Sequence, residues 1–304
     1  MKGILQGNSS MRERDSAPEM VRPASTVILV RQHEEALQVY LLKRNPRSGF
    51  FPGNYVFPGG GVGSLDHDPD LRRSHADGTA GKIAESILPY YVSAIRETFE
   101  EAGVFLGTTG ESGSGWFENA NNDRVSNGLP KGWLRDWVLN RCCLPGFSLL
   151  FPWSHWITPE GMPRRFDTRF FVAFMPPGQV CSPDNRETVH GIWMRPEEAL
   201  IGNLQGEIPL SPPTLVTLQQ LLSYKDLDHL EAAVKERDWG KPKLPRLIKL
   251  SNGAMIVEPW DPMYDREFEV DADRLGSALV PLPEPFSRIW FHEGLWRPVR
   301  VQDA

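Results

Sequence analysis

Three glutamates stand close together in the segment AIRETFEEAGV, which begins at Ala94. A helix turns by about 100° per residue, so Glu97, Glu100 and Glu101 would project from one side of it. Like charges at these spacings destabilise a helix by about 0.2–0.5 kcal/mol per pair, which a solvated helix surface tolerates. The alternative is a binding site for a divalent cation, because Mg²⁺ prefers carboxylate and carbonyl oxygens.

A glycine-rich stretch, FPGGGVGSLDHDPD, begins at Phe57 and precedes the glutamate segment. Glycine has no Cβ, so a turn at Gly59 and Gly60 could approach the helix closely and offer a carbonyl oxygen. A cation held between turn and helix could bridge the oxygens of a diphosphate and neutralise charge during its cleavage. We therefore expect the two stretches to form one site.

Together the two stretches resemble the signature of the Nudix superfamily, Gx5Ex7REUxEExGU. Matched residue by residue, the signature falls on Gly60, Arg96, Glu97, Glu100, Glu101, Gly103 and Val104. The resemblance implies a mixed α/β Nudix fold, an α/β/α sandwich around a mixed sheet. It also implies an enzyme that hydrolyses a nucleoside diphosphate linked to another moiety.

The resemblance further assigns roles within the site. Glu97, Glu100 and Glu101 would bind Mg²⁺ or Mn²⁺ and take part in catalysis, and the Gly60 carbonyl would be a further ligand. The base that activates water varies within the family. Glu100 is one candidate, and Glu187, in the later segment NRETVHGIWM, is a second.

Three further residues would support the site without reacting. The resemblance implies that Arg96 holds the helix glutamates by ion pairing. Gly59 keeps the turn open, and Gly103 suits the position just past the end of the helix.

Two departures from the signature matter. Gly60 and Arg96 are 36 residues apart instead of 14, so 22 residues are inserted. The first glutamate of the signature should lie eight residues before Arg96, and that position is Leu88. Glu85 is the nearest acid. The departure puts an auxiliary ion pair in doubt rather than the metal site.

The insertion also points to one branch of the superfamily. A long segment inside the signature is typical of the branch that includes the peroxisomal coenzyme A diphosphatase of vertebrates and its bacterial relatives. The stretch WITPEGMPRRFDTRFFVA, from Trp156, resembles that branch too. The resemblance implies coenzyme A or acyl-coenzyme A as substrate, cut to 3′,5′-ADP and a phosphopantetheine. ADP-ribose, nucleotide sugars and dinucleotides are alternative substrates, and a non-catalytic nucleotide sensor is an alternative function.

Four arginines are candidates for substrate binding, because guanidinium groups suit phosphate oxygens and coenzyme A carries a 3′-phosphate. Arg44 and Arg47 lie before the glycine stretch, and Arg164 and Arg165 lie in the later one. Pairing with nearby acids on the surface is the alternative for each.

The remaining sequence indicates how these residues are positioned. Residues 1–20 read as a tail, residues 21–240 as the Nudix domain, and residues 241–304 as an extension packed on it. Within the domain, the polar insertion at 63–84 reads as a solvated loop that includes Asp66, and residues 108–128 also read as a loop. Strands are expected at 25–31, 37–44, 55–57, 169–175 and 190–194, and helices at 89–102, 133–140, 212–224 and 227–239.

Composition narrows the class of protein. The formal net charge of −6 gives no reason to expect binding to nucleic acid or to an anionic membrane, so the expected partner is a small molecule. Three cysteines without CxxC spacing argue against a disulfide framework. Neither a membrane-spanning run nor a secretory signal is evident, so a cytoplasmic location is expected.

Overall fold

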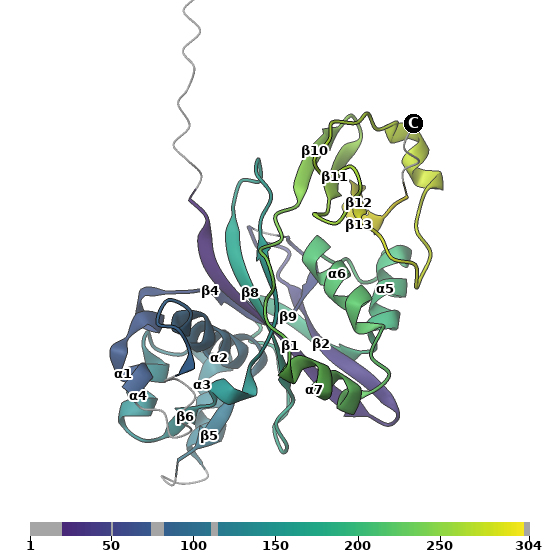
Figure 1. Cartoon of the computed structure of the whole chain (residues 1–304). Helices are drawn as coiled ribbons and strands as arrows, with labels where there is room; N and C mark the ends of the chain where they lie inside the picture. Colours follow the sequence, from purple (N-terminus) through teal and green to yellow (C-terminus); the bar gives the residue numbers. More distant parts are fainter. Residues whose placement is uncertain (1–19, 50, 74–81, 111–114, 301–304) are drawn as a thin grey trace, which may run out of the picture.

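A mixed seven-stranded sheet forms the centre of the protein. The structure is a computed structural model that describes residues 20–49, 51–73, 82–110 and 115–300 (Figure 1). The strand order is β3-β2-β1-β8-β7, with β4 also paired to β1 and β9 to β2; the pairing of β1 with β8 is parallel. The strands are β1 (Arg22–His33), β2 (Ala36–Arg44), β3 (Tyr55–Val56), β4 (Gly59–Gly61), β7 (Phe151–Ile157), β8 (Phe166–Phe174) and β9 (Thr188–Met194).

Both faces of this sheet are covered, which explains the run of apolar residues in β1. Val27 and Leu29 pack under α2 on one face, whereas Ile28 and Val30 pack under the later helices on the other. The first face carries α1 (Pro69–Arg73), α2 (Leu88–Ala102), α3 (Trp116–Ser126) and α4 (Trp133–Leu139); the second carries α5 (Pro196–Gln205), α6 (Pro212–Leu221) and α7 (Leu227–Lys235) (Figure 1). The expected α/β/α sandwich with a mixed sheet is therefore confirmed.

Most expected elements are present, but three segments were wrongly predicted as loops or turns. The insertion at 63–84 carries α1. Residues 108–128 contain α3 and, with the preceding residue, β5 (Gly107–Thr109), which pairs with β6 (Cys143–Pro145). The glycine turn is itself a short strand, β4, paired with β1. Residues 1–19 of the expected tail and 74–81 of the insertion lie outside the described residues.

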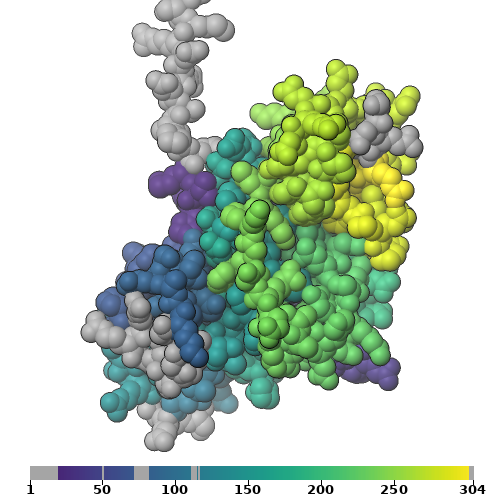
Figure 2. All heavy atoms as spheres, viewed as in Figure 1, coloured from purple at the N-terminus to yellow at the C-terminus, as the bar shows by residue number. Residues whose placement is uncertain are grey.

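A second, four-stranded antiparallel sheet follows residue 241. It consists of β10 (Arg246–Leu250), β11 (Gly253–Val257), β12 (Arg288–His292) and β13 (Leu295–Pro298). Ile256 and Trp296 join the same buried cluster as Leu215 of α6, and Asn203 donates a hydrogen bond to the Trp296 carbonyl (2.8 Å). Figure 2 shows this segment, light green to yellow, lying against the green and teal core. No helix among the described residues is long and apolar enough to cross a membrane.

Candidate active site

Helix α2 presents the glutamates because its other side is buried. Pro89 stands in its first turn, and Gly103 ends it with φ of 71°, a left-handed conformation that glycine adopts without strain. Ile95 and Phe99 are fully buried in the core. Burying this stripe fixes the rotation of the helix, and with it the direction in which the acidic side chains leave the helix.

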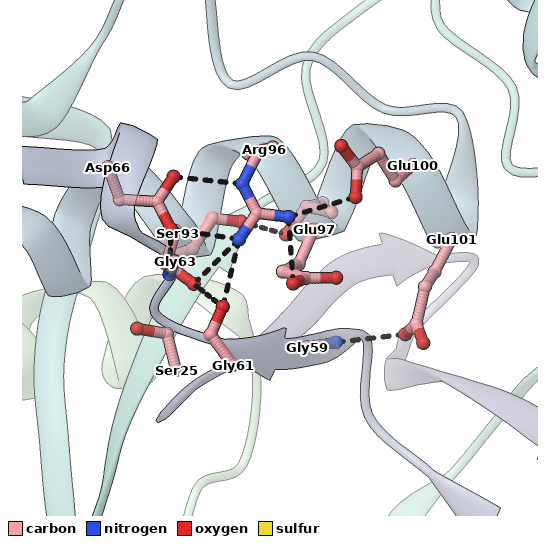
Figure 3. A network of polar contacts seen from close by, with 12 residues as sticks. Ser25, Gly59, Gly61, Gly63, Asp66, Ser93, Arg96, Glu97, Glu100 and Glu101 are labelled. Carbon is pink, nitrogen blue, oxygen red and sulfur yellow. Dashed lines mark hydrogen bonds and ion pairs between the residues drawn. The ribbon is translucent and has the colours of Figure 1, made fainter. Parts of the chain in front are cut away.

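The three carboxylates lie in different surroundings (Figure 3). The Glu100 side chain is 32% exposed and that of Glu97 14%. Glu101 is buried, and the Gly59 backbone N–H donates a hydrogen bond to its Oε2 (3.0 Å). Glu101 therefore ties the helix to β4, while Glu100 is partly exposed and Glu97 is mostly buried.

Strand β4 approaches both α2 and β1 so closely that a Cβ at Gly60 or Gly59 would collide with them. A Cβ added to Gly60 would lie 2.4 Å from the Glu97 Cδ, and one added to Gly59 would lie 2.3 Å from the Ser25 carbonyl oxygen. Both distances are far inside van der Waals contact. The close approach expected from the glycines is therefore present, although it is made by a paired strand rather than a turn.

Arg96 is the centre of the polar network (Figure 3). Its Nη1 donates to Glu97 Oε1 (2.8 Å) and Glu100 Oε2 (2.9 Å), and its Nη2 donates to the Gly61 carbonyl (2.9 Å). Burial lowers the pKa of this guanidinium, but the hydrogen bond to Asp66 and the negative charges of Glu97, Asp66 and Glu100 outweigh burial and raise it. Arg96 is thus a fixed positive charge that orients two of the three carboxylates.

Asp66 completes this network from the insertion. Its Oδ1 accepts from Arg96 Nε (2.8 Å), its Oδ2 accepts from Arg96 Nη2 (2.9 Å), and its side chain is 2% exposed. The prediction of a solvated loop was therefore wrong for Asp66, although His67 beside it is exposed. Leu88, which stands where the signature has a glutamate, packs in the core. Asp66 thus makes the ion pair with Arg96 from a different place in the sequence.

Burial raises the pKa of two glutamates in the cluster, so a nearby positive charge would stabilise their ionised forms. Desolvation raises the pKa of Glu97 to about 7; the pairing with Arg96 opposes this, and the like charge of Glu100 adds to it. Burial and the charge of Glu97 also raise the pKa of Glu101 well above its ordinary value, against the Gly59 hydrogen bond. Carboxyl groups whose charge is disfavoured in this way gain stability from a nearby cation.

The donor set fits a hard divalent cation. It consists of carboxylate oxygens facing a closely approaching glycine strand, the oxygen ligands that Mg²⁺ and Mn²⁺ prefer. As the side chains lie, no group of three or more His, Cys, Asp or Glu converges on one ion position within the described ranges. Two of the carboxylates instead face Arg96, and the third faces Gly59.

Glu187 faces the cluster from the loop before β9. Its negative charge raises the pKa of both Glu97 and Glu101, and all three glutamates line one polar cavity of about 550 Å³. Asp184 holds this loop by accepting hydrogen bonds from the backbone N–H groups of Glu187 (3.0 Å) and Thr188 (2.9 Å). The structure therefore brings the second candidate base to the same cavity as the helix glutamates.

Two supporting residues were missed by sequence reasoning. Trp133 of α4 donates a hydrogen bond from Nε1 to Glu100 Oε1 (2.6 Å). Arg124 of α3 is buried and donates to the Glu100 carbonyl (3.1 Å) and to Ser182 Oγ (2.6 Å). Neither residue lies in a recognisable motif, so only the tertiary structure reveals them.

The four candidate arginines have different positions. Arg44 and Arg164 line a cavity that also includes Gly60, and the positive charge of Arg44 lowers the pKa of Glu101. Arg47 is exposed in the loop after β2, away from this lining. Arg165 donates from Nε to the Thr158 carbonyl (3.1 Å), so its guanidinium holds a loop together. Of these four arginines, Arg44 and Arg164 therefore line the cavity beside Gly60, and Arg47 and Arg165 do not.

Comparisons with known proteins agree with this geometry. A family model described as the NUDT19 Nudix domain matches residues 72–221. Acyl-coenzyme A diphosphatase NUDT19 of Homo sapiens is 27% identical over 300 residues, covering 82% of this chain and 77% of that protein. The Xenopus laevis protein of the same name is also 27% identical, over 283 residues, covering 78% of this chain and 74% of that protein.

Two further relatives extend the comparison. Putative nudix hydrolase 7 of Caenorhabditis elegans is 29% identical over 297 residues, covering 92% of this chain and 88% of that protein. Among solved structures, a NUDIX hydrolase from Alicyclobacillus acidocaldarius superposes with a TM-score of 0.60 at 23% identity, covering 74% of this chain and all of that one. At that identity the superposition shows the fold.

Proposed function

The chain belongs to the Nudix hydrolase superfamily, and we propose that it cleaves the diphosphate linkage of coenzyme A or acyl-coenzyme A with the help of Mg²⁺ or Mn²⁺. The observation that carries this proposal is the cluster of Glu97, Glu100 and Glu101 against the glycine strand β4, ordered by Arg96. The similarity to proteins named acyl-coenzyme A diphosphatase supports the choice of substrate.

The three glutamates and the Gly60 carbonyl would hold the cation. When bound, a divalent ion supplies charge neutralisation at the diphosphate oxygens and lowers the pKa of a water molecule. The protein keeps the ligands in place: Arg96 orients Glu97 and Glu100, Trp133 holds the other Glu100 oxygen, and Gly59 holds Glu101.

Hydrolysis adds water to one phosphorus and breaks the bond from that phosphorus to the bridging oxygen. A carboxylate beside the attacking water accepts its proton. Glu100 and Glu187 both line the polar cavity and are the two groups proposed for this role. Arg44 and Arg164 would bind the non-bridging oxygens of the diphosphate, because guanidinium groups pair well with phosphate. The products would be 3′,5′-ADP and phosphopantetheine or its acyl derivative.

A substrate panel with product identification by mass spectrometry tests the proposal. Purified protein with Mg²⁺ or Mn²⁺ is offered coenzyme A, acyl-coenzyme A, ADP-ribose, a nucleotide sugar and a dinucleotide. We expect 3′,5′-ADP from the coenzyme A substrates at the highest kcat/KM. Faster cleavage of another compound would replace the substrate assignment, and nucleotide binding without any cleavage would favour a sensor.

Two variants connect the activity to the site. Glu100→Gln and Glu101→Gln should each lower kcat by roughly two orders of magnitude or more, because a neutral amide holds the cation less well; at Glu100 it also cannot accept the proton. Glu118→Gln, an exposed change on α3, is the matched control and should keep full activity. Wild-type turnover in both site variants would refute the site assignment.

A further inference from the structure

A second cavity, of about 310 Å³, lies between the main sheet and the C-terminal sheet. Thr168 of β8 and Pro212 of α6 line it from the Nudix core, and Ile256 and Trp296 line it from β11 and β13. Trp156 and Phe170 on the first side and Ile256 and Trp296 on the second belong to one buried apolar cluster. The segment after residue 241 therefore forms a wall of a pocket in addition to covering the core.

This cavity borders the candidate active site at strand β4. Gly59, Gly60 and Gly61 line it, and Gly61 also lines the polar cavity that contains the glutamates. Arg44 and Arg164 line it as well. A diphosphate bound at the glycine strand would therefore lie beside this apolar pocket, and we infer that one of its two substituents enters it.

Glu258 gives the pocket an unusual polar group. Its side chain is completely buried and lines the cavity, yet neither carboxyl oxygen has a hydrogen-bond partner among the described residues. Its backbone is fixed, because its N–H donates to the Ser287 carbonyl (2.8 Å). Most buried polar atoms in proteins are hydrogen-bonded, so an unpaired carboxyl facing a cavity suggests a partner on a bound molecule.

The protonation state of Glu258 determines which chemical group on a bound molecule could hydrogen-bond to it. Burial raises its pKa to about 8, although the positive charge of Lys243 opposes this. Burial likewise lowers the pKa of Lys243, whose ammonium stands 4.9 Å from the centre of the Trp156 ring. A neutral carboxyl offers one O–H donor and one carbonyl acceptor side by side, which is the complement of an amide.

We propose that this cavity binds the acyl-pantetheine arm of the substrate and that Glu258 hydrogen-bonds an amide of that arm. The inference rests on the proposed function. The pantetheine arm carries amides and an apolar acyl chain but no charge, whereas the other half of coenzyme A carries an anionic 3′-phosphate. With Arg44 and Arg164 assigned to the diphosphate, the other charged group in this lining is Glu258. Such a pocket favours the uncharged arm, because a 3′-phosphate there would be buried without a positive partner.

An acyl-chain series tests the pocket. In the wild-type protein we expect kcat/KM to rise by up to about fourfold per added methylene, because burying one CH₂ group contributes about 0.8 kcal/mol. Thr168→Trp fills the pocket and should lower kcat/KM for coenzyme A and abolish the rise with chain length, while thermal unfolding checks that the protein remains folded. Thr109→Trp is the matched control, because Thr109 is exposed on β5 and lines neither cavity, and should behave as wild type.

Substitutions at Glu258 test the amide contact separately. Glu258→Gln keeps one donor and one acceptor and should retain activity, whereas Glu258→Leu keeps only the shape. The loss of one buried hydrogen bond predicts a drop in kcat/KM of about tenfold for the Leu variant. Thermal unfolding of each variant checks that the C-terminal sheet remains folded. Equal activity of the Gln and Leu variants would refute the proposed hydrogen bond.

Product inhibition identifies which half of the substrate occupies the cavity. Thr168→Trp should weaken inhibition by acyl-phosphopantetheine and leave inhibition by 3′,5′-ADP unchanged. The reverse result would mean that the nucleotide lies in the cavity and would overturn the inference. A wild-type protein that cleaves no coenzyme A substrate refutes the proposed function itself. Cleavage without any chain-length dependence refutes only the pocket.

Discussion

Asp66, a residue of the insertion, forms an ion pair with Arg96. We therefore expect a substitution at Asp66 to lower both the stability and the activity of the protein. Asp66→Asn removes the charge and turns one of two acceptor oxygens into a donor. The two contacts to Arg96 are short and the Asp66 side chain is 2% exposed. Asp66 Oδ2 also accepts from the Gly63 N–H (2.7 Å), so the new amide faces donors on at least one side.

The magnitude follows from this geometry. Hydrogen bonds to charged groups contribute about 1.5–3 kcal/mol each, and removing one partner of a buried ion pair destabilises by about 3–5 kcal/mol. Arg96 keeps its contacts to Glu97 and Glu100, so we expect the Asn variant to lose about 2–4 kcal/mol of unfolding free energy. Because Arg96 orients those two glutamates, kcat/KM should fall by about 10–100-fold, as for other residues that position metal ligands.

Urea unfolding and steady-state kinetics on the best substrate of the panel measure both effects. Asp68→Asn is the matched control, since Asp68 lies two residues away and pairs with Arg135, whose side chain is 36% exposed. This control should change stability and activity far less than Asp66→Asn. Equal effects of the two substitutions, or an Asp66→Asn variant with wild-type kinetics, would refute the role assigned to Asp66.

Further predictions concern the glycines, the arginines and the buried carboxyl. Gly60→Ala should lower kcat because its Cβ would displace the Glu97 carboxylate, whereas Gly59→Ala should reduce soluble, folded protein because its Cβ meets backbone; circular dichroism and kinetics separate the two effects. Arg164→Ala should raise KM for coenzyme A more than Arg165→Ala, whose guanidinium bonds a backbone carbonyl. Glu258 ionises at pH 4.5 in the unfolded chain but near 8 in the folded one. The folded protein therefore binds the extra proton in this window, so stability falls as pH rises through it, by about 1.4 kcal/mol per unit of pKa displacement. Unfolding by urea from pH 5 to 8 should show a smaller fall in Glu258→Gln than in the wild type.

Helix α2 and the β1–β2 hairpin were predictable because their patterns are strong. In α2 the apolar residues recur at helical spacing between a proline and a glycine, and each of these signals agrees with the others. In β1 and β2 the apolar runs are long and a short turn joins them. Local sequence is sufficient where the buried surface, the ends and the period of an element all point to the same structure.

Helix α3 was not predictable for the opposite reason. The sequence WFENANNDRVS contains three asparagines, which favour turns over helix interiors, and has no sustained apolar stripe. Tertiary contacts stabilise it instead. Ala120 packs in the core, and Arg124 bonds the end of α2 and Ser182. Sequence periodicity cannot report a helix whose main stabilising contact is one buried guanidinium.

The signature located the three glutamates correctly, but it did not locate the carboxylate that pairs with Arg96. Position 88 lies at the start of α2, and Leu88 is buried there, so a carboxylate at this point would cost a core contact. The same chain inserts residues between β4 and α2, and this insertion returns Asp66 to Arg96 across 30 positions of sequence. What the ion pair requires is a carboxylate within about 3 Å of the guanidinium, not a particular place in the chain. An insertion that packs against the helix can therefore supply the carboxylate that a lost motif residue would have supplied. In this chain the two departures from the signature are linked, because the long insertion carries Asp66 and the glutamate is absent at Leu88.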